Sequence, residues 1–475
     1  MKRTKIICTL GPASTNEKTI TEMLKNGMNV ARINFSHGTH EAHKKTIELF
    51  RKVRDSLGVP AAIMLDTKGP EIRTGTFAAP VTLKAGQKYT LTTNEISGDD
   101  KCCSITYSEL PKKLTVGNTV LIDDGNISLR VESVADTDVN CIVEEGGTVS
   151  SYKGVNVPHV HLDMKYLSDK DKSDILFGIE NDVDYISASF VRSKNDVIDL
   201  RKFLDYHGVH NIKIIAKIEN NEVVENFDEI LTHSDGIMVA RGDMGVEIAY
   251  ERLPGIQKKF IKKCYQSGKV VITATQMLES MINSATPTRA EITDVANAVF
   301  DGTSAIMLSG ETAVGKHPSK VVSVMAKIAE QAERDTFEIN NYTGIQYETD
   351  ASDHTNAICD AACTTARDLN AKAIIAVTKS GYTARRVSKF RPHQAIVAAT
   401  PEKKTFHQLS LSWGVFPVLA LNQSNADKLF AHAVDCAKQI DMVSAGDNVV
   451  IIAGVPLNTT GTTNTIKVEV ISNNN

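Results

Sequence analysis

Several features that would place this chain in a special class of protein are missing from its sequence. No apolar run approaches the length of about 20 residues that spans a membrane. The basic start, residues 1–8, is followed by no apolar segment of the kind found in secretion signals. The 8 cysteines are scattered and lack the paired spacing of a zinc site. We therefore expect a cytoplasmic protein with reduced thiols and no membrane partner.

Neither sign of charge is in large excess. The 53 Lys and Arg stand against 57 Asp and Glu, which gives a net charge of -4. Proteins that bind nucleic acid or anionic membranes usually carry a basic excess, so we expect neither partner, whereas small phosphorylated ligands stay open. A length of 475 residues predicts about three domains, with cores large enough to need no disulfides.

Short apolar runs alternate with amphipathic helical patterns over the first two thirds of the chain. Strands buried on both faces have such continuous apolar runs, and about eight strand–helix units close a parallel barrel. We predict an α/β fold with a (β/α)8 TIM barrel made of residues 1–69 and 168–341, whose chemistry lies where the strands end. The eight runs are residues 5–10, 29–36, 61–68, 183–191, 212–220, 236–241, 270–275 and 305–310.

Two further segments depart from the barrel pattern. Residues 70–167 show short strand and turn signals and no helix before about residue 169, which predicts a small β-barrel inserted at the active-site end. Such an insertion is either a lid that closes over substrate or a passive decoration. From residue 342 to 475 helices and strands alternate again, which predicts an open α/β domain with an edge strand at 465–471.

One cation and two carboxylates follow neighbouring strands of the predicted barrel. Lys217 and Glu219 are two residues apart on one strand, so their side chains point the same way. The next strand ends in Arg241, Gly242 and Asp243. This combination is what a divalent metal holding a phosphorylated acid needs.

A second polar group follows the second and third strands. Arg32, Asn34 and Ser36 alternate along one strand, and Asp66 and Thr67 close the next. A guanidinium binds phosphate as a fork, and the oxygen atoms suit a metal cation. Taken singly, Arg32 fits a buried structural Arg–Asp pair at least as well.

Hydroxyl side chains end the last two strands. Thr275 and Ser309 could bind a carboxylate or relay protons, but a helix N-cap is an equally good interpretation of either residue. Thr288, three residues before Glu291, predicts a capping box with a mainly structural role.

A possible anion site lies in the C-terminal segment. A predicted strand at 373–378 runs through a short loop into a helix, and backbone amides and hydroxyls at a helix start can bind phosphate. A threonine-rich loop at 454–464 could enclose the other end of a ligand. The loop pattern alone fits an ordinary turn as well. The candidate residues are Thr378, Lys379, Ser380, Gly381, Tyr382 and Thr383.

Seven stretches of this sequence closely resemble the pyruvate kinase family, in the same order and spacing along essentially the whole chain. The resemblance implies a barrel, a β-barrel lid and a C-terminal regulatory domain. It also implies transfer of phosphoryl from phosphoenolpyruvate to ADP, which gives pyruvate and ATP in the last step of glycolysis. The stretches are KIICTLGP (5–12), ARINFSHG (31–38), LDTKGPEIR (65–73), KIEN (217–220), DGIMVARGDMG (235–245), ITATQM (272–277) and MLSGET (307–312).

The resemblance implies a role for each matching residue of the predicted active site. Lys217 would stabilise the phosphoryl in transfer, a reaction that depends mostly on positioning and electrostatics. Glu219 and Asp243 would hold Mg2+ or Mn2+, and Gly242, Asp243 and Thr275 would hold the substrate carboxylate. Catalytic and substrate-binding roles thus fall on Lys217, Arg32, Thr275, Ser309, Gly242 and Asp243.

Nucleotide, potassium and effector sites come from the same resemblance. Arg32 and Arg73 would bind phosphate groups, and Ser309 would help deliver a proton. Family members with glutamate at the position of Glu71 tend to need K+, so we expect K+ dependence. A sugar phosphate would activate a homotetramer through residues 378–383. The nucleotide contacts would be Asn34, His37, Arg73 and Lys153, and the K+ ligands Asn34, Ser36, Asp66 and Thr67.

Two rival functions remain open from the residues themselves. A lyase or mutase acting on pyruvate-like substrates in a metal barrel would use Lys217, Glu219 and Asp243 without a nucleotide. A catalytically inactive sensor would bind a sugar phosphate and signal to a partner, although it would have no use for a metal site. An assay with and without ADP separates these alternatives.

Overall fold

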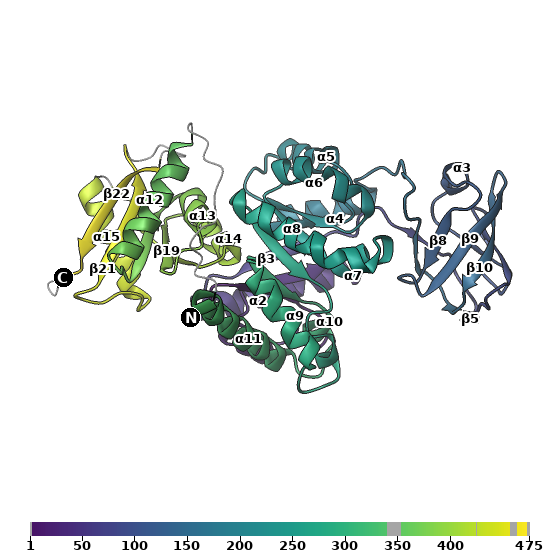
Figure 1. Cartoon of the computed structure of the whole chain (residues 1–475), viewed down its shortest axis with the longest axis horizontal. Helices are drawn as coiled ribbons and strands as arrows, with labels where there is room; N and C mark the ends of the chain where they lie inside the picture. Colours follow the sequence, from purple (N-terminus) through teal and green to yellow (C-terminus); the bar gives the residue numbers. More distant parts are fainter. Residues whose placement is uncertain (1, 340–352, 424, 457–462, 473–475) are drawn as a thin grey trace.

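The computed structural model describes residues 2–339, 353–423, 425–456 and 463–472. The molecule is elongated, and its three parts follow one another along the long axis (Figure 1). A barrel lies in the middle, a small β unit lies at one end and an α/β layer lies at the other. No helix in these described ranges is both long and apolar enough to cross a membrane.

Eight parallel strands close the central barrel, which confirms the predicted fold. Within these strands only Asn34 and Lys213 are not buried, because helices cover the outside and the strands' own side chains fill the inside. In order around the barrel the strands are β1 (Lys5–Thr9), β17 (Ala305–Leu308), β16 (Val270–Ala274), β15 (Gly236–Ala240), β14 (Lys213–Ile218), β13 (Tyr185–Ala188), β3 (Ala62–Asp66) and β2 (Val30–Asn34).

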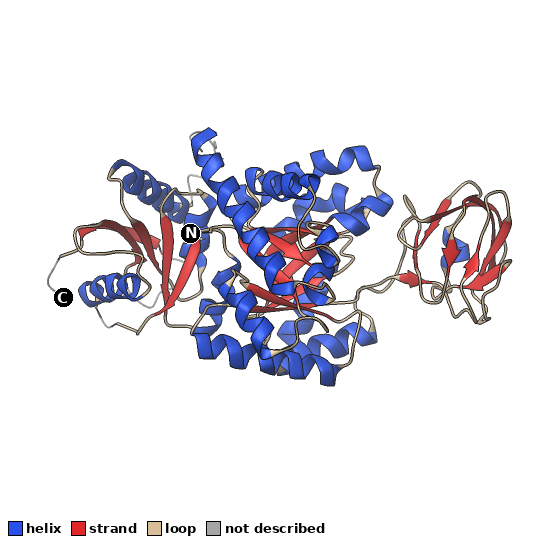
Figure 2. Cartoon of the chain, turned by 90° about the horizontal axis from the view of Figure 1, so that it is seen from below, coloured by secondary structure: helices blue, strands red, loops and turns tan. Residues whose placement is uncertain are grey.

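Helices surround this barrel on all sides (Figure 2). They pack through apolar faces, as where Phe227 and Phe260 stack at 3.8 Å between their ring centres. The predicted capping box is confirmed, since Thr288 and Glu291 each accept the other's backbone N–H. The helices are α1 (Glu17–Lys25), α2 (His40–Leu57), α4 (Asp169–Glu180), α5 (Lys194–Tyr206), α6 (Asn221–His233), α7 (Arg241–Glu247), η1 (Tyr250–Arg252), α8 (Leu253–Gln266), η2 (Glu279–Ile282), α9 (Arg289–Phe300), α10 (Gly310–Ala313) and α11 (Pro318–Ile339).

The segment between β3 and α4 forms the small β unit, which we call the lid. Its main sheet has the order β4-β12-β8-β9-β10-β6-β7, and a bridge between Thr74 and Ile105 joins the two edges into a small barrel. The lid strands are β4 (Ile72–Arg73), β5 (Val81–Thr82), β6 (Lys88–Thr92), β7 (Cys102–Ser104), β8 (Thr119–Ile122), β9 (Ile127–Val134), β10 (Asp138–Glu145), β11 (Thr148–Val149) and β12 (Gly154–Asn156).

One expectation for the lid was wrong, because the segment does contain a helix. The short helix α3 (Leu110–Lys113) has a proline in its first turn and two lysines in its last turn, and it buries Leu110 and Pro111. Four residues are too few to show a helical period, so the hydrophobic pattern could not reveal this element.

The C-terminal part is an open five-stranded sheet with helices on both faces, as predicted. Its strand order is β20-β19-β18-β21-β22, and the last strand runs antiparallel at the edge. The elements are α12 (His354–Asp368), β18 (Ala373–Val377), α13 (Tyr382–Lys389), β19 (Ala395–Thr400), α14 (Lys403–Gln408), η3 (Leu409–Leu411), β20 (Val415–Leu419), α15 (Ala426–Gln439), β21 (Asn448–Gly454) and β22 (Thr463–Val470).

The C-terminal part contacts the amino ends of the barrel strands. Tyr185, the first residue of β13, donates to the Gln408 carbonyl at 2.6 Å. Lys5, the first residue of β1, donates to the Val415 carbonyl at 2.7 Å. The carboxyl ends of the strands therefore face the lid and stay available for chemistry.

Candidate active site

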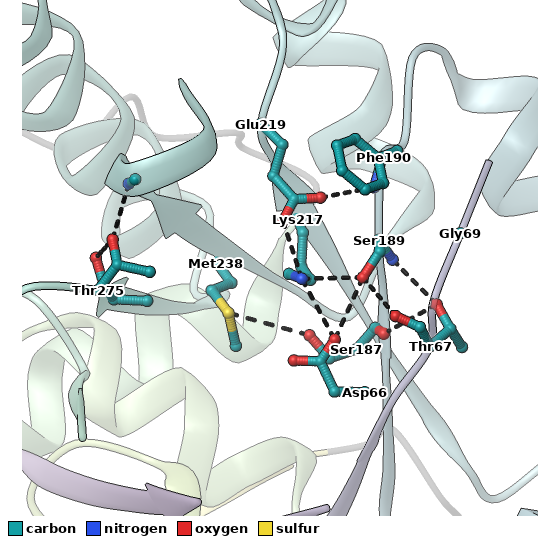
Figure 3. A network of polar contacts seen from close by, with 12 residues as sticks. Asp66, Thr67, Gly69, Ser187, Ser189, Phe190, Lys217, Glu219, Met238 and Thr275 are labelled. Carbon is teal, nitrogen blue, oxygen red and sulfur yellow. Dashed lines mark hydrogen bonds and ion pairs between the residues drawn. The ribbon is translucent and has the colours of Figure 1, made fainter. Parts of the chain in front are cut away.

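The ammonium of Lys217 lies at the centre of a buried polar network at the carboxyl end of the barrel (Figure 3). Its Nζ lies 2.8 Å from Glu219 Oε1, 2.8 Å from Ser189 Oγ and 3.2 Å from Asp66 Oδ1. The residue is 9% exposed, and the three oxygen atoms come from three neighbouring strand ends. Burial lowers the pKa of Lys217, but attraction to Asp66 and Glu219 outweighs burial and raises it above its ordinary value, so the lysine is a fixed positive charge.

Glu219 is the buried carboxylate beside that charge. Its Oε2 accepts the backbone N–H of Phe190 at 2.6 Å, whereas its Oε1 makes the ion pair with Lys217 but no well-directed hydrogen bond. Burial, with the nearby charge of Asp243, raises the pKa of Glu219 to about 7, although Lys217 opposes the shift. A cation between Glu219 and Asp243 would offset this cost and favour the ionised carboxylate.

The donor set fits a divalent cation that also binds substrate. In the part of the chain that the structure describes, no group of three His, Cys, Asp or Glu side chains is arranged to hold a metal ion, and the charge of Asp243 acts on the Glu219 carboxylate. Mg2+ characteristically keeps several waters and uses one or two carboxylates plus substrate oxygens. Two carboxylates next to a cleft are therefore a suitable set for it.

Arg32 is engaged in the Arg–Asp pair that the sequence left open as an alternative. Its Nε donates to Asp66 Oδ2 at 2.5 Å, and its Nη1 donates to Thr9 Oγ1 at 2.9 Å. Burial raises the pKa of Asp66, but Arg32 and Lys217 together lower it below its usual range. One carboxylate thus holds both cations on the same side of the site.

The four predicted K+ ligands lie on two adjacent strand ends. Asn34 and Asp66 are partners in the β2–β3 register. The Asn34 side-chain oxygen accepts the Ser36 N–H at 3.1 Å, and Thr67 Oγ1 accepts the Ser189 N–H at 3.1 Å. A set of carboxylate, amide and hydroxyl oxygens fits a hard monovalent cation.

Thr275 adopts a strained backbone next to the start of α7. Its φ is 68°, which is unusual for a β-branched residue, and its Oγ1 accepts the Gly242 N–H at 2.8 Å. Arg241 holds this turn by donating to the carbonyls of Ala274 and Thr275. The N-cap interpretation was wrong for Thr275, because no helix begins directly after it and the N-cap of the next helix, η2, is Leu278.

Ser309 occupies the N-cap position of α10, but its side chain makes no capping hydrogen bond. Its backbone N–H donates to Glu311 Oε2 at 2.7 Å, which fixes the turn. The predicted N-cap position of Ser309 is therefore confirmed, but its hydroxyl does not cap the helix.

A cleft of about 790 Å3 separates the lid from the barrel and is lined by Arg73, Lys153 and Asp243. Arg73 pairs with Glu71 at 2.6 Å, and Lys153 pairs with Asp123 at 2.7 Å. These two ion pairs on the lid thus line the same cleft as Asp243. Of the predicted nucleotide contacts, Arg73 and Lys153 line this cleft, whereas Asn34 and the exposed His37 do not line it.

The predicted effector loop connects β18 to α13. Gly381 has a φ of 77°, as an ordinary turn requires, and the Lys379 carbonyl accepts from Thr405 Oγ1 at 2.7 Å. Thr383 Oγ1 lies 2.7 Å from Thr463 Oγ1, so this loop does adjoin the start of β22. Most of the threonine-rich loop, residues 457–462, lies outside the described residues.

Sequence reasoning missed two residues at the centre of the site. Ser189 contacts Lys217, and the backbone of Phe190, with a φ of 51°, binds Glu219. Two serines at alternate positions near the end of the apolar run 183–191 were a signal for Ser189. A hydrogen bond from the Phe190 backbone leaves no mark on residue type, so Phe190 could not be found in this way.

Comparison with known proteins agrees with this geometry. Residues 1–322 match the sequence model described as pyruvate kinase, barrel domain, and residues 356–469 match pyruvate kinase, alpha/beta domain. The chain belongs to the pyruvate kinase family. It is accordingly a kinase of the phosphotransferase class, which confirms the resemblance drawn from the sequence.

Several pyruvate kinases align with the whole chain. The enzyme of Clostridium acetobutylicum is 50% identical over 99% of this chain and 100% of its own length. That of Clostridium perfringens is 45% identical with the same coverage. A crystal structure of a pyruvate kinase from Cryptosporidium parvum superimposes with a TM-score of 0.91 at 40% identity, covering 99% of this chain and 96% of the other.

Proposed function

We propose that this pyruvate kinase family member transfers phosphoryl from phosphoenolpyruvate to ADP and releases pyruvate and ATP in the cytoplasm. The observation that carries the proposal is the buried Lys217 ammonium, held 2.8 Å from Glu219, whose neighbours Phe190 and Asn220 line the same cleft as Asp243. In phosphoryl transfer the protein does little covalent chemistry. It mainly has to hold positive charge in a fixed position next to the phosphoryl group. Lys217 and Arg32 provide that charge.

Each remaining residue has a positional task in this reaction. Glu219 and Asp243 would hold Mg2+ or Mn2+, which would supply Lewis acidity toward the phosphoryl group when bound. The Gly242 region and Thr275 orient the substrate carboxylate, and Ser309 helps to deliver a proton to the enolate. Arg73 and Lys153 bring nucleotide phosphates from the lid side, with Asn34 and His37 as further nucleotide contacts. Closing the lid over the cleft excludes water, which would otherwise accept the phosphoryl group.

An assay of pyruvate formation tests the proposal. Phosphoenolpyruvate and Mg2+ should yield pyruvate only when ADP is present, with ATP formed in equal amount. Pyruvate formed without ADP would support the lyase or mutase alternative instead. Absence of turnover with all three components would support the sensor.

We propose that K+ binds at Asn34, Ser36, Asp66 and Thr67 and is needed for activity. The Glu71 carboxylate pairs with Lys68 at 3.1 Å and with Arg73. The side chain at position 71 therefore does not supply the positive charge that a lysine at this position would supply. Replacing K+ by a bulky organic cation should reduce kcat at least about tenfold, since one preorganised positive charge is lost. Glu71→Lys should restore activity without K+, whereas Glu71→Gln should not; full wild-type activity without K+ would refute the site.

We also propose that a sugar phosphate activates a homotetramer through residues 378–383. The contact between Thr383 and Thr463 supports a site shared by two segments. Activation should be lost in Ser380→Ala combined with Thr383→Ala, and kept in Thr365→Ala, because the half-buried Thr365 hydroxyl donates within α12 to the Ala361 carbonyl. A panel of sugar phosphates and AMP identifies the activator, and unchanged activation in the double variant overturns the assignment. Analytical ultracentrifugation reports the oligomeric state.

A further inference from the structure

Ser189 has no part in the function proposed so far, yet its hydroxyl is an immediate neighbour of Lys217 (Figure 3). It follows β13 directly and is 1% exposed. Ser189 Oγ accepts from Lys217 Nζ at 2.8 Å. Its single hydrogen can be donated to the Thr67 carbonyl at 2.6 Å or to Asp66 Oδ1 at 3.2 Å. The hydroxyl therefore links the lysine to the strand end that carries Asp66 and Thr67.

The backbone around Ser189 is held on all sides. Its N–H donates to Thr67 Oγ1 at 3.1 Å, and its carbonyl accepts from Tyr166 Oη at 3.1 Å. Gly69, with a φ of 73°, passes so close that a Cβ there would lie 2.8 Å from the Ser189 carbonyl oxygen. A hydroxyl on such a fixed backbone has little freedom, which is what a group that orients another side chain requires.

The Lys217 ammonium has three N–H bonds, and their partners explain why a fixed Ser189 hydroxyl matters. In the described structure Asp66 and Ser189 accept hydrogen bonds from this ammonium, and Glu219 is its ion-pair partner. Of these, Glu219 is also one of the two carboxylates suited to the divalent cation. If Glu219 serves that cation, Asp66 and Ser189 alone fix the ammonium, and the third N–H is available to the phosphoryl group.

We propose that Ser189 is a positioning residue that holds Lys217 in the geometry needed for phosphoryl transfer. The inference rests on the proposed function and deepens it. Ser187 provides a matched control, because it precedes Ser189 by two residues, is 0% exposed, and its hydroxyl lies 4.0 Å from the sulfur of Met238.

Steady-state kinetics of Ser189→Ala, Ser189→Thr and Ser187→Ala test the proposal. Losing a hydrogen bond to a charged group should lower kcat about 10- to 100-fold in Ser189→Ala. KM for phosphoenolpyruvate and the affinity for Mn2+, measured directly by paramagnetic resonance, should change less than about threefold, because Lys217 would act mainly in the transition state. Ser189→Thr, which keeps the hydroxyl, should recover part of kcat, and Ser187→Ala should stay near wild type.

A second readout does not depend on turnover. Ser189→Ala should lower Tm by about 2 °C or more in the wild-type background, but less in a Lys217→Met background, because the charged partner is then absent. Equal Tm losses in both backgrounds, or a kcat within twofold of wild type in Ser189→Ala, overturn the inference. An inactive wild type overturns the proposed function instead, and the Tm comparison then still decides whether Ser189 acts through Lys217.

Discussion

Single residues decide the chemistry of this site, and Lys217 shows how. A buried charge is costly unless partners surround it, and here two carboxylates and a hydroxyl lie within 3.2 Å. The alternation of side chains on a strand was enough to predict that Lys217 and Glu219 face the same space. The third partner, Ser189, comes from another strand, so its contact depends on strand order and could not be derived from local spacing.

Replacing that charge should stop the reaction. Lys217→Met keeps the length of the side chain but removes the ammonium, so kcat should fall by at least about 100- to 1000-fold, as for other preorganised electrostatic groups. Mn2+ binding should stay largely intact because both carboxylates remain. Lys213→Met is the matched control, since Lys213 begins the same strand and pairs with Asp235 at 3.2 Å. Turnover in Lys217→Met equal to that of the control would defeat the assigned role.

A second prediction at this scale concerns His407 on α14. Its side chain is buried, neither ring nitrogen has a hydrogen-bond partner in the described ranges, and burial next to Arg54 lowers its pKa to about 3. Between pH 6.5 and 3 the His407 imidazole therefore binds a proton in the unfolded chain but not in the folded chain. The free energy of unfolding consequently falls as the pH falls. The loss attributable to this residue should reach about 2 kcal/mol at pH 5.

Thermal melts at pH 7.5 and pH 5 check this. His407→Phe should lose less stability on acidification than wild type, whereas His233→Phe, at an exposed position on α6, should behave like wild type. An acid response unchanged by His407→Phe would show that the buried imidazole is not responsible.

At the scale of elements, the hydrophobic pattern predicted every barrel strand, because strands buried on both faces consist almost entirely of apolar residues. It missed α3, whose single turn carries no periodicity. It also missed the packing of the turn after β3, where Gly69 passes over Ser189. A close backbone approach depends on two segments about 120 residues apart, and local pattern contains no information about it.

Gly69→Ala tests the importance of that approach. Gly58 and Gly69 both have left-handed backbones, with φ of 63° and 73°, but a Cβ at Gly58 would meet nothing within 4 Å. Gly58→Ala should therefore cost about 1–2 kcal/mol with kcat unchanged. Gly69→Ala should cost more and also lower kcat, because Ser189 must shift. Similar kinetics for the two variants would argue against a functional role for the turn.

The arrangement of the whole molecule leaves one end of the barrel to the C-terminal part and the other to the lid. Sequence predicted three units and put the lid at the active-site end, but it did not predict that the C-terminal part covers the other end. Such contacts join residues hundreds of positions apart, as Tyr185 and Gln408 do. On the return from the lid, Arg192 donates to the carbonyls of Leu162 and Met164 and ties this segment to the barrel.

Lid closure follows from this arrangement. On the lid side the 790 Å3 cleft is lined by Arg73 and Lys153 with their ion-pair partners Glu71 and Asp123, and on the barrel side it is lined by Asp243. A ligand with phosphates and a divalent metal should replace these ion pairs with its own contacts and draw the two sides together. Small-angle scattering should show a smaller radius of gyration with Mg2+, oxalate and ATP than with buffer alone. Oxalate without metal serves as the control, and a radius unaffected by the complete mixture would contradict closure.

The most direct measurement is a crystal structure with Mn2+ and oxalate, which stands in for the enolate of pyruvate. Anomalous scattering should place the ion between Glu219 and Asp243, at the usual metal–oxygen distance of about 2.0–2.2 Å, with oxalate on its open side and Lys217 beside it. An ion bound away from these two carboxylates would contradict the account.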